Sequence, residues 1–399
     1  DRESGVEKAG GRIVAISTLD GNRYPGKMFI DCTFEGDLMA AAGADYFVGR
    51  EANSRFGEDY NGFRATDEYN GHQFLSRVDP YKVRGDKSSG LLKFISPESP
   101  LPDGAADKKV QAYCFRMCLT DVPENMVKIG KPEGYDPADY ELGARFFEAE
   151  PKAWPLTISR LPNGKTDINN RMAFSTDFIG GSYDWPEASY ERRREIFDAH
   201  LAYQKGLMYF LQNDPRVPEQ TRRAFAKFGL SKDEFASTGH WPFSLYVREG
   251  RRMDGEYVMT QHDCQNTRMT PRPVGMGSYT LDSHNTSRYV TREGYVRNEG
   301  DVQVPLKAPY KISYGAIVPK RGQVDNLLVP VACSASHIAY GSIRMEPVFM
   351  ILGQSAAAAA AQAIDDGCAV QDVDYSKLSK TLERDGQILN MSVQTPNRN

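Results

Sequence analysis

Two of the six histidines in this chain of 399 residues lie where their neighbours favour acid–base chemistry. His284 stands in Asp-Ser-His-Asn, two residues after Asp282, and His337 follows Ser-Ala-Ser. Oxidation of an alcohol needs a base that accepts the hydroxyl proton, and imidazole titrates in the range that this task requires. Asp282 can orient His284 or only cap a turn. A lone histidine more often has a structural role. Both histidines are therefore candidate bases, and a purely structural role stays open as the alternative for each.

A long helix behind His337 offers a site for an anion or an electron-rich ring. Residues 327–332 predict a buried strand, residues 333–345 a loop, and Pro347 and Gly367 mark the first turn and the end of a helix. A helix N-terminus carries unpaired N–H groups and a partial positive charge. Four residues directly before this helix are predicted either to contact a ligand there or to serve only in capping and loop packing. They are Ser342, Ile343, Arg344 and Met345.

Three other groups of residues have competing interpretations. The segment 261–264 (Gln-His-Asp-Cys) and the segment 282–284 contain metal-ligand residue types but no recognised zinc spacing, so no metal site is predicted. Three arginines lie close to Glu249 in the sequence, namely Arg248, Arg251 and Arg252. They predict an internal ion-pair cluster, or a site that binds a carboxylate or polyol substrate. Aromatic residues between 154 and 246 have the composition of a sugar-stacking surface, and a hydrophobic core has the same composition.

The overall composition argues against some classes of partner. The formal net charge is −4 and the pI is about 6.0, which gives no electrostatic reason to expect nucleic acid or an anionic membrane. We expect no membrane span, because no apolar run is long enough for one. Six scattered cysteines do not predict a disulfide scaffold. The sequence leaves the compartment and a homo-oligomeric state open.

The elements that must position these residues form an α/β layer at both ends of the chain, with a mixed α+β insert between them. Near the start, a strand, a turn and a short helix over 38–43 follow one another. The turn between them contains Thr33, Glu35, Gly36 and Asp37, where Gly36 can make the turn and Asp37 can cap the helix. The predicted elements are a β-hairpin over 11–31, long loops over 53–105, a strand over 111–120, helices over 187–213, 218–229 and 233–260 (one helix or two), and short strands and loops over 270–320.

Several of these segments together resemble one protein family. Residues 29–38 (Phe-Ile-Asp-Cys-Thr-Phe-Glu-Gly-Asp-Leu) with 49–51 (Gly-Arg-Glu), and residues 326–361, are similar to blocks of the FAD-dependent oxidoreductase family of bacterial flavoproteins. Residues 248–257 and 282–284 are similar to further blocks. The order and spacing of the blocks are specific, and the resemblance covers nearly the whole chain. That family has a dinucleotide-binding fold of the glutathione-reductase type.

The resemblance implies FAD as the cofactor and hydride transfer to flavin from a carbon that bears a hydroxyl or amine. It implies a small-molecule substrate, with a carbohydrate or related polyol as the expected class. Residues near the FAD phosphates or ribose would be Thr33, Glu35, Gly36 and Asp37. Residues at the flavin would be Ser334, Ser342, Ile343, Arg344 and Met345. Arg344 and the helix N-terminus would stabilise the negative charge of reduced flavin.

The sequence departs from the family pattern at one point. Such proteins open with Gly-x-Gly-x-x-Gly, which holds the FAD pyrophosphate, and no such segment occurs here. The nearest glycine pairs, Gly10-Gly11 and Gly180-Gly181, lack its spacing. We therefore expect an N-terminal segment of the same protein, or another chain, to complete the fold.

The sequence thus predicts an α/β protein with a Rossmann-like FAD-binding layer that lacks its N-terminal part. The predicted division is 1–52 and 321–399 for the FAD-binding layer and 53–320 for the substrate insert. Two alternatives to a hydride-transferring oxidoreductase stay open. One is a binding or structural module that keeps the fold without FAD. The other is a carbohydrate-active lyase or hydrolase built on His284, Tyr279 and acidic residues.

Overall fold

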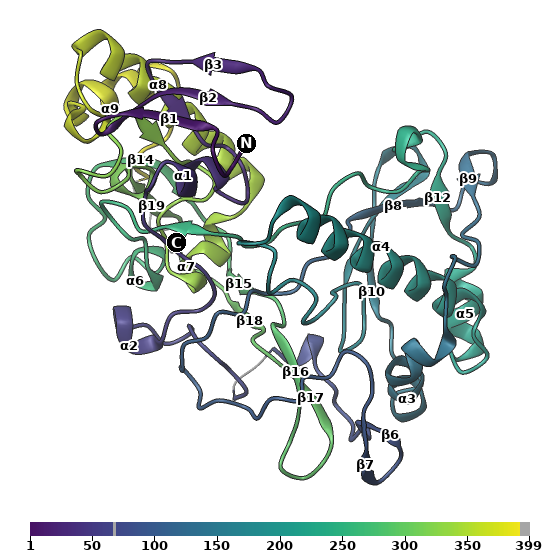
Figure 1. Cartoon of the computed structure of the whole chain (residues 1–399). Coiled ribbons are helices and arrows are strands. Elements are labelled where there is room, and N and C mark those ends of the chain that lie inside the picture. Colours follow the sequence, from purple (N-terminus) through teal and green to yellow (C-terminus); the bar gives the residue numbers. More distant parts are fainter. Residues whose placement is uncertain (67–68, 392–399) are drawn as a thin grey trace, which may run out of the picture.

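The computed structural model describes residues 1–66 and 69–391, which form two lobes (Figure 1). The two ends of the chain build one lobe, and the middle of the chain builds the other. Three clusters of buried apolar side chains underlie this arrangement. The insert core joins residues 74–247 with Val296, the helix core joins residues 259–389, and a small hairpin core joins residues 13–44 with 253 and 324–332.

An antiparallel sheet opens the first lobe and confirms most of the predicted hairpin. Its strands are β1 (Val6–Ala9), β2 (Arg12–Ser17) and β3 (Arg23–Pro25). Gly21 has a φ of 84°, so the predicted turn uses a left-handed residue. The returning strand does not continue to residue 31. Instead, β4 (Phe29–Ile30) pairs in parallel with β20 (Leu327–Leu328).

The long helix predicted from Pro347 to Gly367 is confirmed as α8 (Glu346–Asp366). Pro347 lies in its first turn, and Gly367 ends it with a φ of 63°. Of the helices in the described part of the chain, α8 alone is long and apolar enough to cross a membrane, but half of its apolar window is buried in the protein, as in a core helix. Helix α9 (Tyr375–Arg384) packs beside it.

The predicted loop over 333–345 is wrong in part, because it contains helix α7 (His337–Ile343). The Ser336 side chain caps this helix by accepting the Ala339 N–H at 3.3 Å. All seven residues of α7 are buried, so this helix has no exposed polar face. Its sequence therefore lacks the alternation of apolar and polar residues that identifies a surface helix.

Short elements complete the first lobe around α7 and α8. Strand β14 packs against α8, and strand β15 packs against α7. The elements are α1 (Asp37–Ala41), β5 (Tyr46–Phe47), α2 (Asn53–Phe56), β13 (Arg252–Met253), α6 (Gln261–Cys264), β14 (Pro273–Gly277), β15 (Leu281–Ser283), β18 (Val302–Val304) and β19 (Tyr310–Ser313).

A five-stranded antiparallel sheet forms the second lobe, with the order β10-β11-β8-β12-β9. Helix α4 (Tyr190–Asn213) crosses in front of this sheet, and α5 (Glu219–Phe225) packs against α4 (Figure 1). Both confirm predicted helices. The remaining elements are β6 (Tyr81–Val83), β7 (Asp86–Leu91), β8 (Met117–Thr120), β9 (Met126–Val127), α3 (Glu141–Ala149), β10 (Leu156–Arg160), β11 (Lys165–Asn170), β12 (Gly229–Ser231), β16 (Ser287–Val290) and β17 (Val296–Glu299).

The helix predicted over 233–260 is wrong. This segment contains a single turn of 3-10 helix (Ala236–Thr238) and strand β13. Gly239 adopts a φ of 69°, and Pro242 follows closely, so a continuous helix is interrupted. Residues 247–253 are all buried, which removes the exposed face that a surface helix needs.

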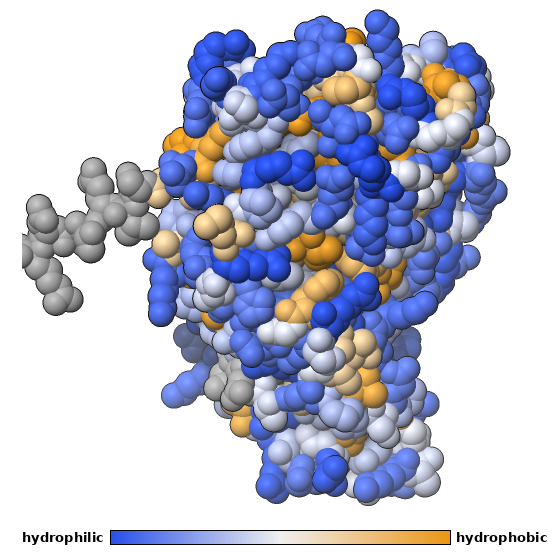
Figure 2. Space-filling model, turned by 90° about the vertical axis from the view of Figure 1, so that its left-hand side faces the viewer, coloured by the Kyte–Doolittle hydropathy of each residue, from blue (hydrophilic) through white to orange (hydrophobic). Residues whose placement is uncertain are grey.

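The predicted domain boundary at residue 320 stays a prediction. Apolar side chains of 259–318 share the helix core with those of 328–389, while the insert core draws mainly on residues 74–247. The face of the molecule that carries α6 and α9 is mostly hydrophilic, and its apolar residues form small separate patches (Figure 2). Scattered patches of that kind need no partner.

Candidate functional site

His284 lies where the two lobes meet, directly after strand β15. Its Nδ1 donates a hydrogen bond to Asp177 Oδ2 at 2.7 Å, and its Nε2 lies 3.7 Å from Asp282 Oδ2. The side chain is 8% exposed. Strand β15 pairs with β18, which fixes the backbone before this histidine. Nδ1 is therefore held by a carboxylate, while Nε2 makes no hydrogen bond to any described residue.

The charges around His284 favour its neutral form. Asp177 Oδ1 lies 3.0 Å from Arg248 Nη2, and both side chains are buried. Burial would raise the pKa of Asp177, but Arg248 and His284 outweigh burial and lower it to about 2. Burial and then the Arg248 charge lower the pKa of His284. At neutral pH the ring is thus uncharged and able to accept a proton at Nε2.

His72 stacks beside His284, although the sequence assigned it no catalytic role. The ring centroids lie 6.1 Å apart with an interplanar angle of 23°. His72 Nδ1 contacts Asp301 Oδ2 at 2.5 Å. Burial would lower the pKa of His72, but Asp301, Asp177 and Asp282 outweigh it and raise the pKa.

Arg344 joins this group from the end of α7. Its Nη2 donates to Asp282 Oδ2 at 2.5 Å, and Gln303 donates to the other oxygen of Asp282. Arg344 is 4% exposed, and its Nε has no hydrogen-bond partner in the described part of the chain. A buried guanidinium N–H without a partner is unfavourable, so it points to a ligand acceptor at the start of α8.

His337, the second candidate base, has both ring nitrogens bound to protein groups. Nδ1 donates to the Glu249 carboxylate at 2.8 and 3.0 Å, and Nε2 accepts from Ser283 Oγ at 3.1 Å. Glu249 also pairs with Arg252 Nε at 2.8 Å. Burial would raise the pKa of Glu249, but His337 and Arg252 outweigh it and lower the pKa. The predicted internal ion pairs are thus present, but of the three arginines only Arg252 binds Glu249, while Arg248 binds Asp177 and Arg251 binds Asp37.

The candidates between 33 and 37 lie in the loop between β4 and α1. Asp37 forms ion pairs with Arg193 at 2.5 Å and Arg251 at 2.7 Å. Glu35 accepts a hydrogen bond from Trp185 Nε1 at 3.1 Å. Thr33 and Gly36 belong to a turn that the Asp31 carboxylate organises, and Gly36 has a φ of 62°.

The turn after β4 lies close to the start of α8. Phe34 packs its ring on Phe349 of α8, with centroids 6.0 Å apart. Thr33 is exposed beside it. The two predicted cofactor segments, which are about 300 residues apart in sequence, therefore meet at one end of α8.

The other candidates near α8 differ in their access to a ligand. Ser334 Oγ accepts the Gly255 N–H at 3.0 Å, and Ser342 Oγ accepts from Tyr310 at 2.8 Å, so both serve internal contacts. Ile343 is fully buried. Met345 is half-buried and caps α8. The structure thus gathers Asp282, His284, His337, Ser342, Ile343, Arg344 and Met345 around β15, α7 and the start of α8.

The start and outer face of α8 fit the flavin end of FAD. The Arg344 N–H without a partner and the helix N-terminus both favour a polar, electron-rich ring edge. Gly353 has no atom within 4 Å of the position that a Cβ would take, and Met350 is 74% exposed, so a flat group can approach this face. Gly36, in contrast, packs on Met39 and Ala332 and does not open onto a ligand. The fit therefore covers the ring system rather than the phosphates.

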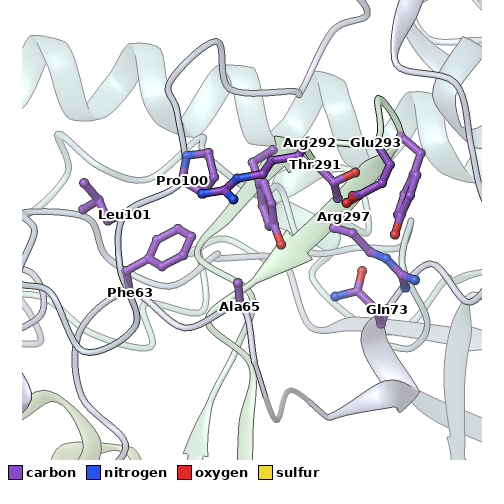
Figure 3. A pocket seen from close by; sticks show the side chains of 11 residues that line it. Phe63, Ala65, Gln73, Pro100, Leu101, Thr291, Arg292, Glu293 and Arg297 are labelled. Atoms are coloured by element: carbon purple, nitrogen blue, oxygen red, sulfur yellow. The ribbon is translucent and has the colours of Figure 1, made fainter.

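A cavity of about 590 Å³ lies beside the β16–β17 hairpin, near the segment that carries His72 (Figure 3). Phe63 and Pro100 stand on one side, and Gln73 and Arg297 stand on the other. Tyr289 and Tyr295 also line it. Its walls thus combine aromatic rings with polar groups.

Several residues of this candidate site gave no motif in the sequence. Asp177, Asp301, His72 and Gln303 reach the site from segments that carry no motif, and their partners are 21 to 229 residues away. In the described ranges, no group of three or more His, Cys, Asp or Glu side chains is placed to hold a metal ion. Trp241 and Trp154, which the sequence offered for sugar stacking, pack in the insert core.

Comparison with known proteins identifies the family. The family model described as FAD dependent oxidoreductase matches residues 2–382. Searches of curated proteins and of solved structures found no match. The family match confirms the expected FAD cofactor and implies a Rossmann-like α/β fold, and it favours a redox enzyme over a binding module or a lyase. This chain therefore belongs to the FAD-dependent oxidoreductase family.

Proposed function

We propose that this enzyme oxidises a hydroxyl-bearing carbon of a carbohydrate or polyol, with His284 as the base. One observation carries the assignment: Asp177 holds His284 Nδ1 at 2.7 Å, while Nε2 makes no hydrogen bond to any residue that the structure describes. A neutral imidazole that is oriented in this way matches the role of a general base. FAD, when bound, accepts the hydride.

Each residue around His284 has a task in proton transfer. His284 Nε2 takes the hydroxyl proton as the C–H bond of the same carbon gives up its electron pair. Asp177 then stabilises the imidazolium through the existing hydrogen bond. Arg248 keeps Asp177 ionised, because it holds the carboxyl pKa at about 2. Asp282 accepts from Arg344, which leaves Arg344 Nε for the ring edge of the cofactor.

His337 has a positioning role in this proposal. Both of its ring nitrogens are occupied, and the Ser283 hydroxyl that it binds belongs to the residue before His284. His337 and Glu249 thereby anchor strand β15. This arrangement supports His284 over His337 as the base.

The cavity of Figure 3 supports a carbohydrate or polyol as the substrate class. Tyr289 and Tyr295 offer apolar ring surface, and the exposed Arg292 and Glu293 offer polar groups around about 590 Å³. Sugars need both kinds of contact, since their rings have C–H faces and hydroxyl edges. Residues 53–320 supply this wall, so we assign substrate binding to the insert and FAD binding to 1–52 and 321–399.

We further propose a glutathione-reductase-type layer that a further segment completes at strand β4. The only strand that pairs with β4 among the described residues is β20, and a parallel pair of two residues each is weak alone. Thr33 and Phe34 lie exposed beside this strand. A strand–helix unit from the same protein or from a partner chain would cover them and supply the phosphate contacts.

Absorbance and flavin reduction test the proposed function. The purified chain, with FAD added, should show the spectrum of bound flavin, and one member of a panel of monosaccharides and polyols should bleach it without oxygen. His284→Ala should keep the bound spectrum and lower the reduction rate by about 10²–10⁴-fold. His240→Asn is the control, because His240 lies in a surface loop with a φ of 66° that Asn tolerates. Unchanged reduction in His284→Ala would remove His284 from the mechanism.

A further inference from the structure

We infer that His72 and His284 form one site for two neighbouring hydroxyl groups of the substrate. His284 accepts the proton of the hydroxyl that is oxidised, and His72 donates a hydrogen bond from Nε2 to the adjacent oxygen. The inference rests on the proposed function and deepens it, because it assigns the substrate class as a vicinal diol and names a second catalytic residue.

The geometry of the two rings carries the inference. They stack with centroids 6.1 Å apart, and each Nδ1 contacts its own buried carboxylate. Each ring is therefore oriented, and neither Nε2 has a hydrogen-bond partner among the described residues. The two Nε2 atoms belong to separate rings that lie side by side, so each can serve its own oxygen, as two neighbouring hydroxyl groups provide.

The segment that carries His72 is fixed against the strands around His284. The His72 carbonyl accepts from Asn285 Nδ2 at 3.1 Å and from Asn298 Nδ2 at 2.9 Å. Asn285 directly follows His284 in the chain. These hydrogen bonds to the His72 carbonyl therefore fix the position of the His72 backbone relative to that of His284.

The surrounding charges divide the two histidines into a donor and an acceptor. His72 faces Asp301, Asp177 and Asp282, which together raise its pKa despite burial. His284 faces Asp177, Asp282 and Arg248, and burial with Arg248 lowers its pKa. Neighbouring groups whose pKa values move apart in this way are suited to acid and base roles. His72 keeps its proton throughout, so the hydroxyl proton goes to His284 and the hydride goes to FAD.

NMR of histidine-labelled full chain with FAD tests the pairing without any turnover. His72 should titrate at a higher pH than His284, and at pH 7 His284 should be a neutral ring that is protonated only at Nδ1. His72→Asn removes a positive charge 6.1 Å away and should raise the pKa of His284 by about 0.5–2 units, for effective dielectric constants of about 80 to 20. Asp301→Asn should lower the pKa of His72. His240→Asn should change neither.

Two model alcohols test the diol. 1,2-Cyclohexanediol should shift the resonances of both His72 and His284, whereas cyclohexanol should shift those of His284 alone or of neither. Equal responses to the two alcohols would overturn the two-oxygen site. A His72 pKa at or below that of His284, or a His284 pKa that stays unchanged in His72→Asn, would overturn the pairing.

A kinetic comparison separates this inference from the proposed function. With a polyol that reduces the flavin, His72→Asn should keep the bound-flavin spectrum and slow reduction by about 10²–10⁴-fold. A compound that lacks the second hydroxyl should lose little further rate in this variant. If His284→Ala slows reduction and His72→Asn does not, the paired site fails and the base assignment stands. If no polyol reduces the flavin, the substrate class fails while the NMR result still decides the pairing.

Discussion

Asp177→Asn tests the charge arrangement of the site most directly. It removes one negative charge from a position 3.0 Å from Arg248 and 2.7 Å from His284, and it leaves the size of the side chain almost unchanged. Asp177 and Arg248 are both 2% exposed, so water cannot replace the lost partner. The substitution therefore leaves a buried guanidinium without its carboxylate.

The structure sets the size of the effect. The pKa of Asp177 falls from its ordinary 3.8 to about 2, which corresponds to about 2–3 kcal/mol of stability at neutral pH. Breaking a buried pair costs about 3–5 kcal/mol, because the remaining charge stays buried. Since the folded pKa is the lower one, this stability is present above pH 4 and disappears as the pH falls through about 2. We expect the variant to lack this acid-sensitive contribution.

Catalysis should suffer through the tautomer of His284. The new side-chain amide can donate to Nδ1, which places the ring proton on Nε2, where it blocks proton acceptance. We expect flavin reduction to fall by about 10²–10⁴-fold while FAD stays bound. Arg248 favours this orientation of the amide, because it can only donate hydrogen bonds and so holds the new carbonyl oxygen toward itself and the amide NH2 group toward His284.

Urea unfolding between pH 3 and pH 7, with flavin reduction measured in parallel, checks both effects. Asp184→Asn is the matched control, since Asp184 pairs with Arg192 at the surface and should cost less than about 1 kcal/mol. A stability loss in Asp177→Asn as small as that of the control would refute the buried-pair reasoning. Normal reduction kinetics would refute the tautomer argument.

Two further predictions concern the supports of the site. Gly341→Ala should destabilise the protein by about 1–3 kcal/mol in urea unfolding, because its Cβ would lie 2.3 Å from the Asp282 carbonyl oxygen. Gly353→Ala is the control in helix α8, where the Cβ meets open space, and it should raise the free energy of unfolding by about 0.5–1 kcal/mol. Glu249→Gln should cost about 1–3 kcal/mol in the same assay, since it weakens two buried charge-assisted hydrogen bonds while Arg252 keeps Glu51; Glu148→Gln at the exposed Arg84 pair should cost less than about 1 kcal/mol. Equal effects within either pair would contradict the packing or charge argument.

Local signals explain which elements the sequence could predict. Pro347 and Gly367 mark the ends of α8 by the backbone chemistry of proline and glycine, which does not depend on distant residues. Helix α7 lacks such marks and is buried on all sides, so its helical periodicity was hidden. The segment 233–260 shows the converse, since apolar spacing suggested a helix that Gly239 and Pro242 interrupt.

The site was predictable only where its residues are close in sequence. Asp282 and His284 stand together in one tripeptide, and Arg344 precedes a recognisable helix. Asp177 and Asp301 orient the two stacked histidines from 107 and 229 residues away, and one sequence holds no information on such pairings. From the sequence, His72 could therefore be predicted only to line a substrate pocket in the insert, without a partner or a role in proton transfer.

Three fully buried arginines form ion pairs, and one of them limits how the lobes can move. Arg50 binds Asp107 and Glu299, Arg248 binds Asp177, and Arg252 binds Glu51 and Glu249. The Arg50–Glu299 pair joins the segment between β5 and α2 of the first lobe to β17 of the second lobe, so opening the junction there would separate buried charges at a cost of about 3–5 kcal/mol. We therefore expect little hinge motion between the lobes at this point.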